Sequence, residues 1–143
     1  MTAQRSRKEE LRYRIYRKQT NINVCEFCQP LPEQELNITD QFKVIRNKFP
    51  YTIWDGQTVV EHLMIVPKMH TDTVAHFTKE MVADYFKLLK AYEKQGYNVY
   101  ARAPTSKIKS IAHQHTHLLK TEGRPKSIIL LLRRPFYIRL VKS

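Results

Sequence analysis

The feature that most constrains the fold is the stretch AHQHTHLL, in which His113, His115 and His117 stand at every second position. Side chains of a β-strand alternate between its two faces, so this spacing predicts a strand over residues 110–121 with the three imidazoles in one row. Such a row makes a poor apolar core, because each ring carries nitrogens that need hydrogen-bond partners. It indicates buried structural histidines, an adventitious metal-binding row, or a site of histidine chemistry.

Two other segments have a helical period. Residues 77–96 carry an apolar stripe, with Thr78 as the N-cap and Gly96 as the end. Residues 5–19 are rich in Arg, Lys and Glu and predict a short basic helix. The apolar positions are Met81, Tyr85, Leu88, Leu89 and Tyr92 in the first segment and Leu11, Ile15 and Tyr16 in the second.

Several short apolar segments read as strands bounded by turn residues. They cover residues 42–47, 51–55, 61–68, 97–103, 127–134 and 136–142, with turns around 48–50 and 122–125. Many strands with two helices predict an α+β domain with an antiparallel sheet. The 143 residues suit one such domain, which we place at 21–143 with basic C-terminal strands, preceded by a basic helical extension at 1–20.

The charge is strongly basic: 25 Lys and Arg face 13 Asp and Glu, for a formal net charge of +12. Such a field attracts phosphates on nucleotides, nucleic acids or membranes, although it also serves solubility. No apolar run approaches the ~20 residues of a membrane span. The N-terminal segment lacks the apolar centre of a secretory signal, and two cysteines are too few for a disulfide framework, so we expect a cytoplasmic protein.

The two cysteines form the pair Cys25-x-x-Cys28. Thiolates at this spacing hold one tetrahedral zinc when two further ligands are supplied. A redox pair would open a helix in a βαβ unit, which Pro30 and Pro32 argue against, and unrelated free thiols are the remaining alternative.

These motifs together resemble the histidine triad family. AHQHTHLL matches the family's His-x-His-x-His pattern followed by two apolar residues, and HLMIVPKMHTDTVAHFT resembles its strand and Pro-Lys-x-His turn. The spacing from GYNVYARA to the triad is also similar, as is the Cys-x-x-Cys of zinc-containing members. The similarity runs over about residues 24–121, and it implies an antiparallel sheet flanked by helices and a homodimer.

The resemblance also implies a chemistry. Members hydrolyse or transfer nucleotidyl groups, and the middle histidine is the nucleophile that forms a covalent nucleotidyl-histidine. That residue is His115 here, with His117 contacting the phosphate or holding the tautomer of His115. Zinc-containing members take their two further ligands from the positions of His70 and His113, which implies a structural zinc on Cys25, Cys28, His70 and His113.

The phosphate-binding positions depart from the family pattern. The resemblance assigns this role to Ser110, Asn98, Arg102 and Lys109, although Ser110 is equally well an ordinary strand hydroxyl. Arg102 stands where members often have Asn, and Ile108 and Lys109 stand where they have Gly-Gln. Glu61 replaces the Gly that precedes a histidine, here His62. The site is therefore more cationic than usual, which suits a more highly charged substrate or reflects lost activity.

The sequence thus predicts a zinc-containing nucleotide hydrolase or nucleotidyltransferase acting at an α-phosphate, similar to nucleoside phosphoramidases and dinucleoside polyphosphate hydrolases. Removal of a nucleotidyl group from nucleic-acid ends is one alternative. A non-catalytic basic module that binds nucleotide or nucleic acid is another. The basic and aromatic C-terminal strands fit base stacking on a nucleic acid or a solvated edge strand. We expect no membrane partner.

Overall fold

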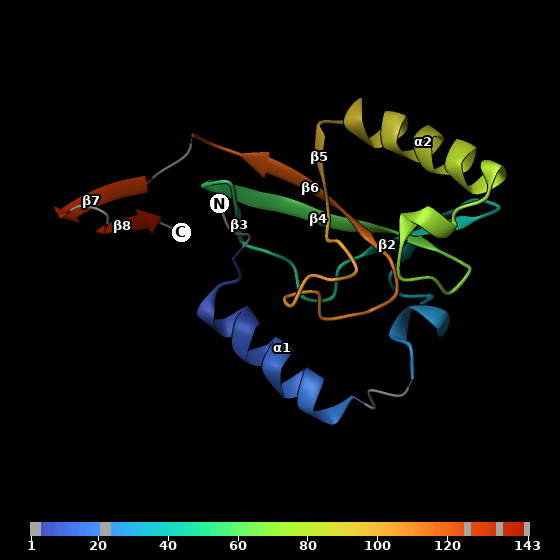
Figure 1. The fold of residues 1–143 in the computed structure, drawn as a ribbon, viewed down its shortest axis with the longest axis horizontal. Coiled ribbons are helices and arrows are strands. Elements are labelled where there is room, and N and C mark those ends of the chain that lie inside the picture. Colours follow the sequence, from blue (N-terminus) through green and yellow to red (C-terminus); the bar gives the residue numbers. More distant parts are fainter. Residues whose placement is uncertain (1–3, 21–23, 125–126, 134–135, 142–143) are drawn as a thin grey trace.

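The computed structural model describes residues 4–20 and 24–124 together with the backbone of residues 127–133 and 136–141. Its centre is a six-stranded antiparallel sheet in the order β1-β2-β4-β6-β5, with β3 paired to β4 (Figure 1). This confirms the predicted α+β class and the antiparallel sheet. The strands are Glu35–Ile38 (β1), Phe42–Arg46 (β2), Ile53–Trp54 (β3), Gln57–Pro67 (β4), Tyr97–Ala101 (β5) and Thr116–Glu122 (β6).

Helix α2 (Lys79–Glu93) covers one face of the sheet (Figure 1). It begins where predicted, because the Thr78 side chain accepts a hydrogen bond from the amide of Met81. Its apolar stripe packs on the sheet and forms the larger core, as predicted. The buried members of that core are Phe42, Val44, Leu63, Ile65, Met81, Leu88, Tyr97 and Leu118.

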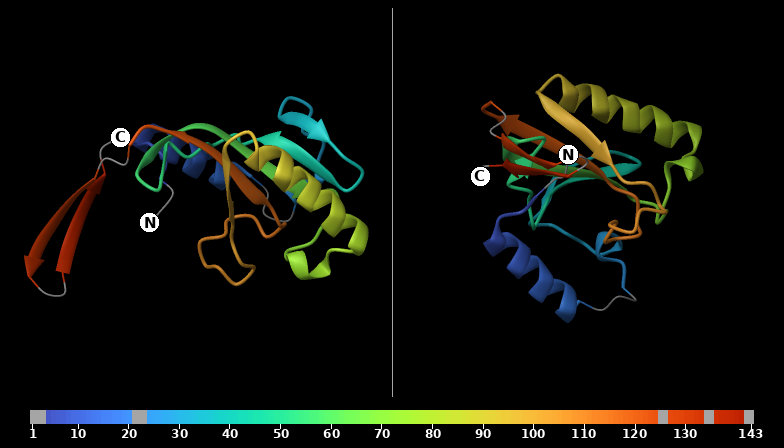
Figure 2. Two further views of the ribbon diagram at one scale, coloured as in Figure 1. Left: turned by 90° about the horizontal axis from the view of Figure 1, so that it is seen from above. Right: turned by 60° about the vertical axis from the view of Figure 1, so that its left-hand side comes forward.

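Helix α1 (Arg7–Gln19) lies on the opposite side of the sheet from α2 (Figures 1 and 2), and its presence confirms the helix predicted over 5–19. Of the three apolar positions named for this helix, only Tyr16 packs inward. Leu11 and Ile15 are about half exposed, whereas Tyr13 and Tyr16 pack their rings against Phe49. The helix therefore buries an aromatic edge against the loop before β3.

The strand predicted over 110–121 is shorter than expected and begins at Thr116. The preceding residues leave the sheet because the amide of Gln114 donates to the carbonyl of Thr71, which draws this segment toward the loop after β4. His113 and His115 therefore precede the strand, and only His117 lies within it. The predicted single row of three imidazoles on one strand is wrong.

Other strand boundaries also differ. The strand expected at 51–55 is reduced to Ile53–Trp54, because Asp55 and Gly56 have positive φ angles and form a two-residue hairpin turn into β4. β4 starts earlier than expected, and β5 ends at Ala101 rather than at residue 103.

A separate antiparallel hairpin is formed by β7 (Ser127–Arg133) and β8 (Phe136–Val141), beyond the end of β6 (Figure 2). The last residues of both predicted strands, Arg134 and Lys142, lie outside the described residues. None of the helices in the described ranges is long and apolar enough to cross a membrane.

Candidate active site and metal centre

His115 is held by a hydrogen bond that fixes its tautomer. Its Nδ1 lies 2.8 Å from the carbonyl oxygen of His113, and a carbonyl can only accept, so Nδ1 carries the proton. The lone pair is then on Nε2. Burial lowers the pKa of His115, and the positive charges of Lys109 and Arg102 lower it further, while the bond to His113 opposes them. The ring is therefore a neutral imidazole with a nucleophilic Nε2 near pH 7.

His117 belongs to a second chain of hydrogen bonds. The amide of Tyr51 donates to Nδ1 of His62 at 3.0 Å, so the proton of that ring is on Nε2. This Nε2 lies 2.9 Å from Nδ1 of His117, which must accept. The proton of His117 is consequently on its own Nε2, where it can be donated to a ligand.

Both rings of this chain are buried and uncharged. Burial lowers the pKa of His62 to about 3, with smaller contributions from the charges of Arg5 and His115. Burial also holds the pKa of His117 well below its usual value. Tyr51 stacks on His62 at a centroid distance of 4.8 Å, and Tyr100 stacks on His117 at 5.7 Å, so the two rings are enclosed by aromatic faces.

His115 and His117 line one cavity on the side of the sheet that carries α1. Cross-strand partners share a face, and His117 pairs with Met64 of β4 and Tyr100 of β5, away from the α2 core. The remaining walls come from the N-terminal segment with α1, the turn at Glu26–Cys28 and the segment after it, the segment before β3, strand β4 and the loop between β5 and β6. They are Arg5, Tyr13, Tyr16, Glu26, Phe27, Gln34, Asn47, Lys48, Phe49, Tyr51, Met64, Arg102, Ile108, Ser110 and Ile111.

The predicted phosphate-binding residues divide into two groups. Arg102 and Ser110 line the cavity with the two histidines. Lys109 does not line it among the described residues; its ammonium donates to the carbonyl of Asp72 at 2.8 Å and to Oε1 of Gln114 at 3.0 Å. Lys109 therefore acts on His115 through its charge.

Asn98 is also not among the cavity residues in the described part of the chain. Its side-chain amide donates to the carbonyl of Leu119 and lies 3.4 Å from the hydroxyl of Thr121. Glu61, the residue in place of the family's Gly, contacts Tyr97 and Arg46. Asn98 and Glu61 thus bind neighbouring parts of the sheet.

The four predicted metal ligands lie together. Nδ1 of His113 is 3.3 Å from Sγ of Cys25, and Nδ1 of His70 is 3.2 Å from Sγ of Cys28. All four donor atoms lie within 4.8 Å of one another. Two thiols and two imidazole nitrogens at this separation are the donor set of a tetrahedral zinc.

The tautomer of His113 also fits a metal. Its Nε2 lies 3.0 Å from the carbonyl oxygen of Pro67, so Nε2 carries the proton and the lone pair of Nδ1 faces the thiols. Burial lowers the pKa of His113 to about 4, which keeps the ring neutral, as a ligand must be. Phe27 contacts the rings of both His113 and His115 and separates the two centres by one aromatic side chain.

Several cavity residues carried no signal that the sequence analysis used. Tyr51 and Phe49 come from an irregular segment, and Arg5 and Tyr13 come from the N-terminal extension. Tyr16 was identified by its helical spacing but not as a cavity residue. The spacing of Tyr13 and Tyr16 by three residues is the one local sign that they share a helix face.

No family model and no curated protein matches the chain. Solved structures do match it. A histidine triad (HIT) family hydrolase from Legionella pneumophila is 21% identical, with a TM-score of 0.52, and the match covers 71% of this chain and 94% of that one. A HIT family hydrolase from Clostridium thermocellum is also 21% identical, with a TM-score of 0.54 and coverage of 74% and 98%.

A Zn-bound histidine triad family protein from Mycobacterium smegmatis is 17% identical, with a TM-score of 0.52 and coverage of 72% and 78%. At these identities the comparisons establish the fold. The chain has the fold of the histidine triad proteins.

Proposed function

We propose that the chain is a histidine triad enzyme that hydrolyses or transfers a nucleotidyl group through a covalent intermediate on His115. The observation that carries this proposal is the bond from Nδ1 of His115 to the His113 carbonyl. It directs the proton away from Nε2, in a residue that lines a cavity shared with His117 and Arg102. A base of this kind suits attack on a phosphorus centre.

In the proposed first step, Nε2 of His115 bonds to the α-phosphorus, and the bond from phosphorus to the leaving group breaks. The electron pair stays on the leaving atom. An amine or alkoxide leaving atom takes a proton from solvent water, because His117 is neutral and holds a single proton. Nε2–H of His117, oriented by the hydrogen bond from His62, instead donates a hydrogen bond to an oxygen of the reacting phosphate. In the second step, water or an acceptor hydroxyl attacks the same phosphorus and loses its proton to solvent, and the bond to His115 breaks with its electron pair returning to Nε2.

The side chains around the nucleophile suit the charge that develops at phosphorus. Arg102 and Ser110 line the cavity and supply a guanidinium and a hydroxyl to the phosphate oxygens. Lys109 adds a positive charge close enough to lower the pKa of His115. The same charge helps to keep the nucleophile unprotonated.

We further propose that Cys25, Cys28, His70 and His113 hold a structural zinc, as the donor set and the Zn-bound relative support. The zinc would stabilise the N-terminal turn η1 (Glu26–Cys28) and the loop before β6 against the sheet. A cytoplasmic location, a homodimer and the division into an extension at 1–20 and a domain at 21–143 remain predictions.

The test is a hydrolysis panel with trapping of the intermediate. Purified protein is offered an adenosine phosphoramidate, a guanosine phosphoramidate, a dinucleoside polyphosphate and a 5′-adenylated DNA end, and is then quenched during turnover with alkaline denaturant, because the bond from phosphorus to histidine is labile in acid. We expect release of a nucleoside monophosphate and a mass increase of one nucleotidyl group on the peptide that contains His115. Turnover without any labelled peptide would argue for direct attack by water, and binding without turnover would favour the non-catalytic module.

A further inference from the structure

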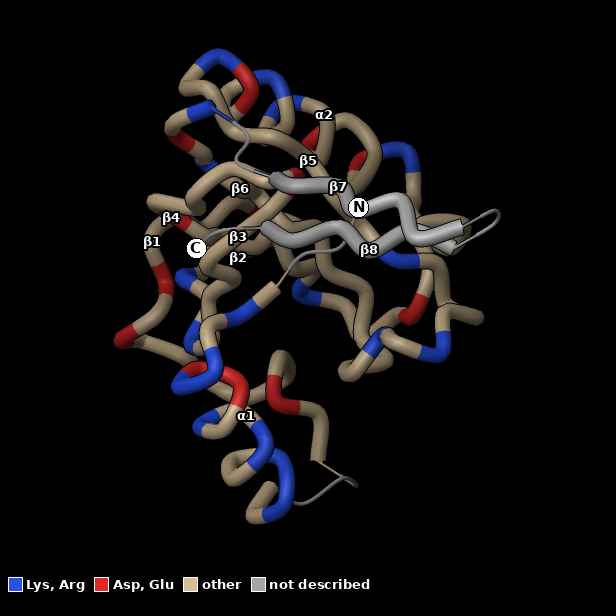
Figure 3. The backbone as a smooth tube through the Cα atoms, turned by 90° about the vertical axis from the view of Figure 1, so that its left-hand side faces the viewer, with Lys and Arg blue, Asp and Glu red and all other residues tan. Residues whose placement is uncertain are grey.

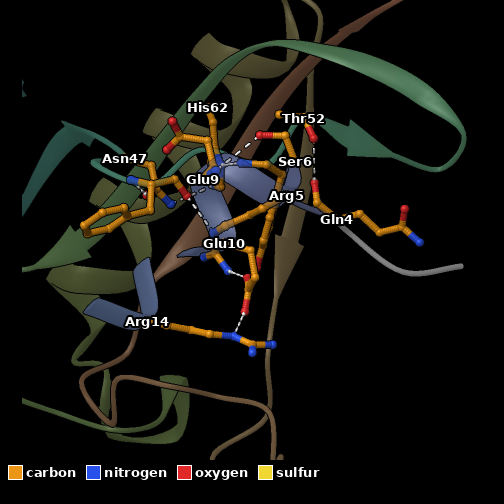
Figure 4. A network of polar contacts seen from close by, with 11 residues as sticks. Gln4, Arg5, Ser6, Glu9, Glu10, Arg14, Asn47, Thr52 and His62 are labelled. Carbon is orange, nitrogen blue, oxygen red and sulfur yellow. Dashed lines mark hydrogen bonds and ion pairs between the residues drawn. The ribbon is translucent and has the colours of Figure 1, made fainter. Parts of the chain in front are cut away.

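The N-terminal segment is built onto the sheet beside the cavity. Gln4 forms a bridge with Ile53 of β3: its amide donates to the Ile53 carbonyl at 2.9 Å, and the amide of Thr52 donates to its carbonyl at 2.8 Å. Ser6 then caps α1 by accepting from the amide of Glu9. Arg5 lies between these two anchors, as Figure 4 shows, and its position is fixed from both sides.

The guanidinium of Arg5 is held at the cavity with donors to spare. Its Nε donates to the carbonyl of Phe49 at 3.0 Å, and the side chain is only 16% exposed. Nη1 lies 3.6 Å from a carboxylate oxygen of Glu10, but Arg14 lies closer to that carboxylate, at 3.0 Å. A guanidinium has five N–H donors, so several are available to a ligand in the cavity that Arg5 lines.

Arg5 and Arg102 each lie against a tyrosine that contacts His117. The Arg5 guanidinium lies 5.0 Å from the ring centre of Tyr51, whose ring is 5.5 Å from that of His117. The Arg102 guanidinium lies 5.1 Å from the ring centre of Tyr100, which stacks on His117 from the strand β5. Two guanidinium groups therefore lie near His117, and each of them contacts the ring of a tyrosine that packs against this histidine.

We propose that Arg5, together with Arg102, binds a phosphate of the leaving group, so that the preferred substrate is a nucleotide joined to its leaving group by a phosphoanhydride. This rests on the proposed function. When the anhydride breaks, the electron pair stays on an oxygen of the leaving phosphate, which becomes an anion and needs no proton. Two guanidinium groups stabilise such an oxygen directly. A neutral amine leaving group would bring them no partner.

The charge of α1 is consistent with this assignment. Figure 3 shows Lys and Arg along the helix, whose residues 7–19 carry Arg7, Lys8, Arg12, Arg14, Arg17 and Lys18 against Glu9 and Glu10. Most of these cations lie on the exposed side of the helix. They can attract a polyanion, while Arg5 is the one of the N-terminal arginines that lines the cavity.

The test compares Arg5→Gln with two other variants. Arg5→Lys keeps the charge, and Arg14→Gln removes one charge from the exposed side of the same helix. We expect Arg5→Gln to lower kcat/KM for diadenosine tetraphosphate by about tenfold or more, the size of one charge-assisted hydrogen bond, and to change it less than about threefold for an adenosine phosphoramidate. Arg5→Lys should recover part of the loss, and Arg14→Gln should alter neither substrate.

The relative loss on the two substrates decides the proposal. An equal loss on both would show that Arg5 only anchors the N-terminal segment, and no loss on either would show that it contacts no substrate. A 5′-adenylated DNA oligonucleotide separates two sources of the anhydride. A loss matching that on the tetraphosphate supports the shared anhydride chemistry, whereas a loss on the oligonucleotide alone would overturn it and assign Arg5 to the polymer.

A binding measurement separates failure of this proposal from failure of the proposed function. His115→Ala protein is titrated calorimetrically with AMP and with ATP, with and without Arg5→Gln. We expect Arg5→Gln to weaken ATP binding by about tenfold and AMP binding much less, because only ATP carries phosphates beyond the α position. Equal weakening of both would overturn the role of Arg5, even in a protein that turns over none of the panel.

Discussion

Two histidine centres lie next to each other on one side of the sheet, and the same side chain does different work in each. One is the thiol centre, formed by Cys25, Cys28, His70 and His113. There, Nε2–H of His113 donates to the Pro67 carbonyl, which leaves the lone pair of Nδ1 facing the two cysteines. In the cavity, Nδ1–H of His115 donates to the His113 carbonyl, which leaves the lone pair on Nε2, as the proposed nucleophile requires. The backbone carbonyl that accepts from each ring therefore decides which ring nitrogen keeps a lone pair and whether that lone pair faces the thiols or the cavity.

The largest effect should come from His115. Replacing it by Ala or Asn removes the proposed nucleophile, so we expect kcat to fall by at least about 10³-fold, since the residues around it cannot replace it. Steady-state kinetics and the thermal midpoint are measured together. We expect the thermal midpoint of these variants to be unchanged, because the proposed metal donors are intact. Retained activity would assign the chemistry to another group.

The thiol centre should behave in the opposite way. Cys25→Ser, or removal of the metal by a chelator, should lower the thermal midpoint by roughly 10 °C, because a structural metal contributes folding free energy of at least a few kcal/mol to a domain of this size. Metal analysis of the freshly purified protein should give about one zinc per chain. Zinc bound to His115 and His117 instead would remove the distinction between the two centres.

His62 tests the hydrogen bond that orients His117. Its Nε2–H sets the tautomer of His117, although the assigned chemistry never places it on the substrate. His62→Ala should lower kcat by about tenfold to a hundredfold, and His62→Gln should lower it less, because a Gln amide can still donate to Nδ1 of His117. The difference between the two variants is the readout, since a purely packing role would not distinguish them by hydrogen-bond donation.

Stability should fall in acid partly through the same residue. The pKa of His62 is lowered to about 3 in the folded protein, against about 6.5 in the unfolded chain, so the unfolded chain binds more protons between these values. The free energy of unfolding therefore decreases as pH falls from about 6.5 toward 3. Denaturant unfolding at pH 7, 5 and 4 should show a shallower decrease in His62→Gln than in the unaltered protein. Equal slopes would mean that His62 is charged or exposed in the fold.

Local sequence spacing was sufficient to predict the helix at 79–93 and to indicate Cys25 and Cys28 as a pair of metal ligands, whereas His70 and His113 were assigned by the resemblance to the histidine triad family. Those predictions depend on short motifs and on the period of α2. The cavity wall formed by α1 and the residues before it was not predictable, because it depends on contacts between distant parts of the sequence. The hydrogen bond from Arg5 to Phe49, for example, joins residues that are 44 positions apart. A helical period also does not indicate which side of a helix packs against the sheet. Leu11, which the spacing placed on the apolar side, is exposed.

The start of β6 was missed for a related reason. Alternation alone predicts a strand wherever polar and apolar residues alternate, and it contains no information on the bond from Gln114 to Thr71 that ends the pairing. That bond places His113 in the thiol centre and leaves His117 on the sheet. A contact between distant segments therefore decides how the triad is divided.

The smallest expected effect tests whether the two faces of the sheet are independent. Thr116 stands between His115 and His117 in the sequence but points to the α2 side, where its hydroxyl lies 2.7 Å from that of Tyr85. Tyr85→Phe removes this hydrogen bond and should cost about 1 kcal/mol, or roughly 3 °C in thermal midpoint. The ring of Tyr85 still packs on Phe42 and Phe77, so the core keeps its shape. Because the bond lies on the α2 side, kcat should stay within about twofold of the unaltered enzyme. A large fall in kcat with a small fall in stability would mean that the start of β6, fixed from the α2 side, sets the position of the nucleophile, and that the two faces act as one unit.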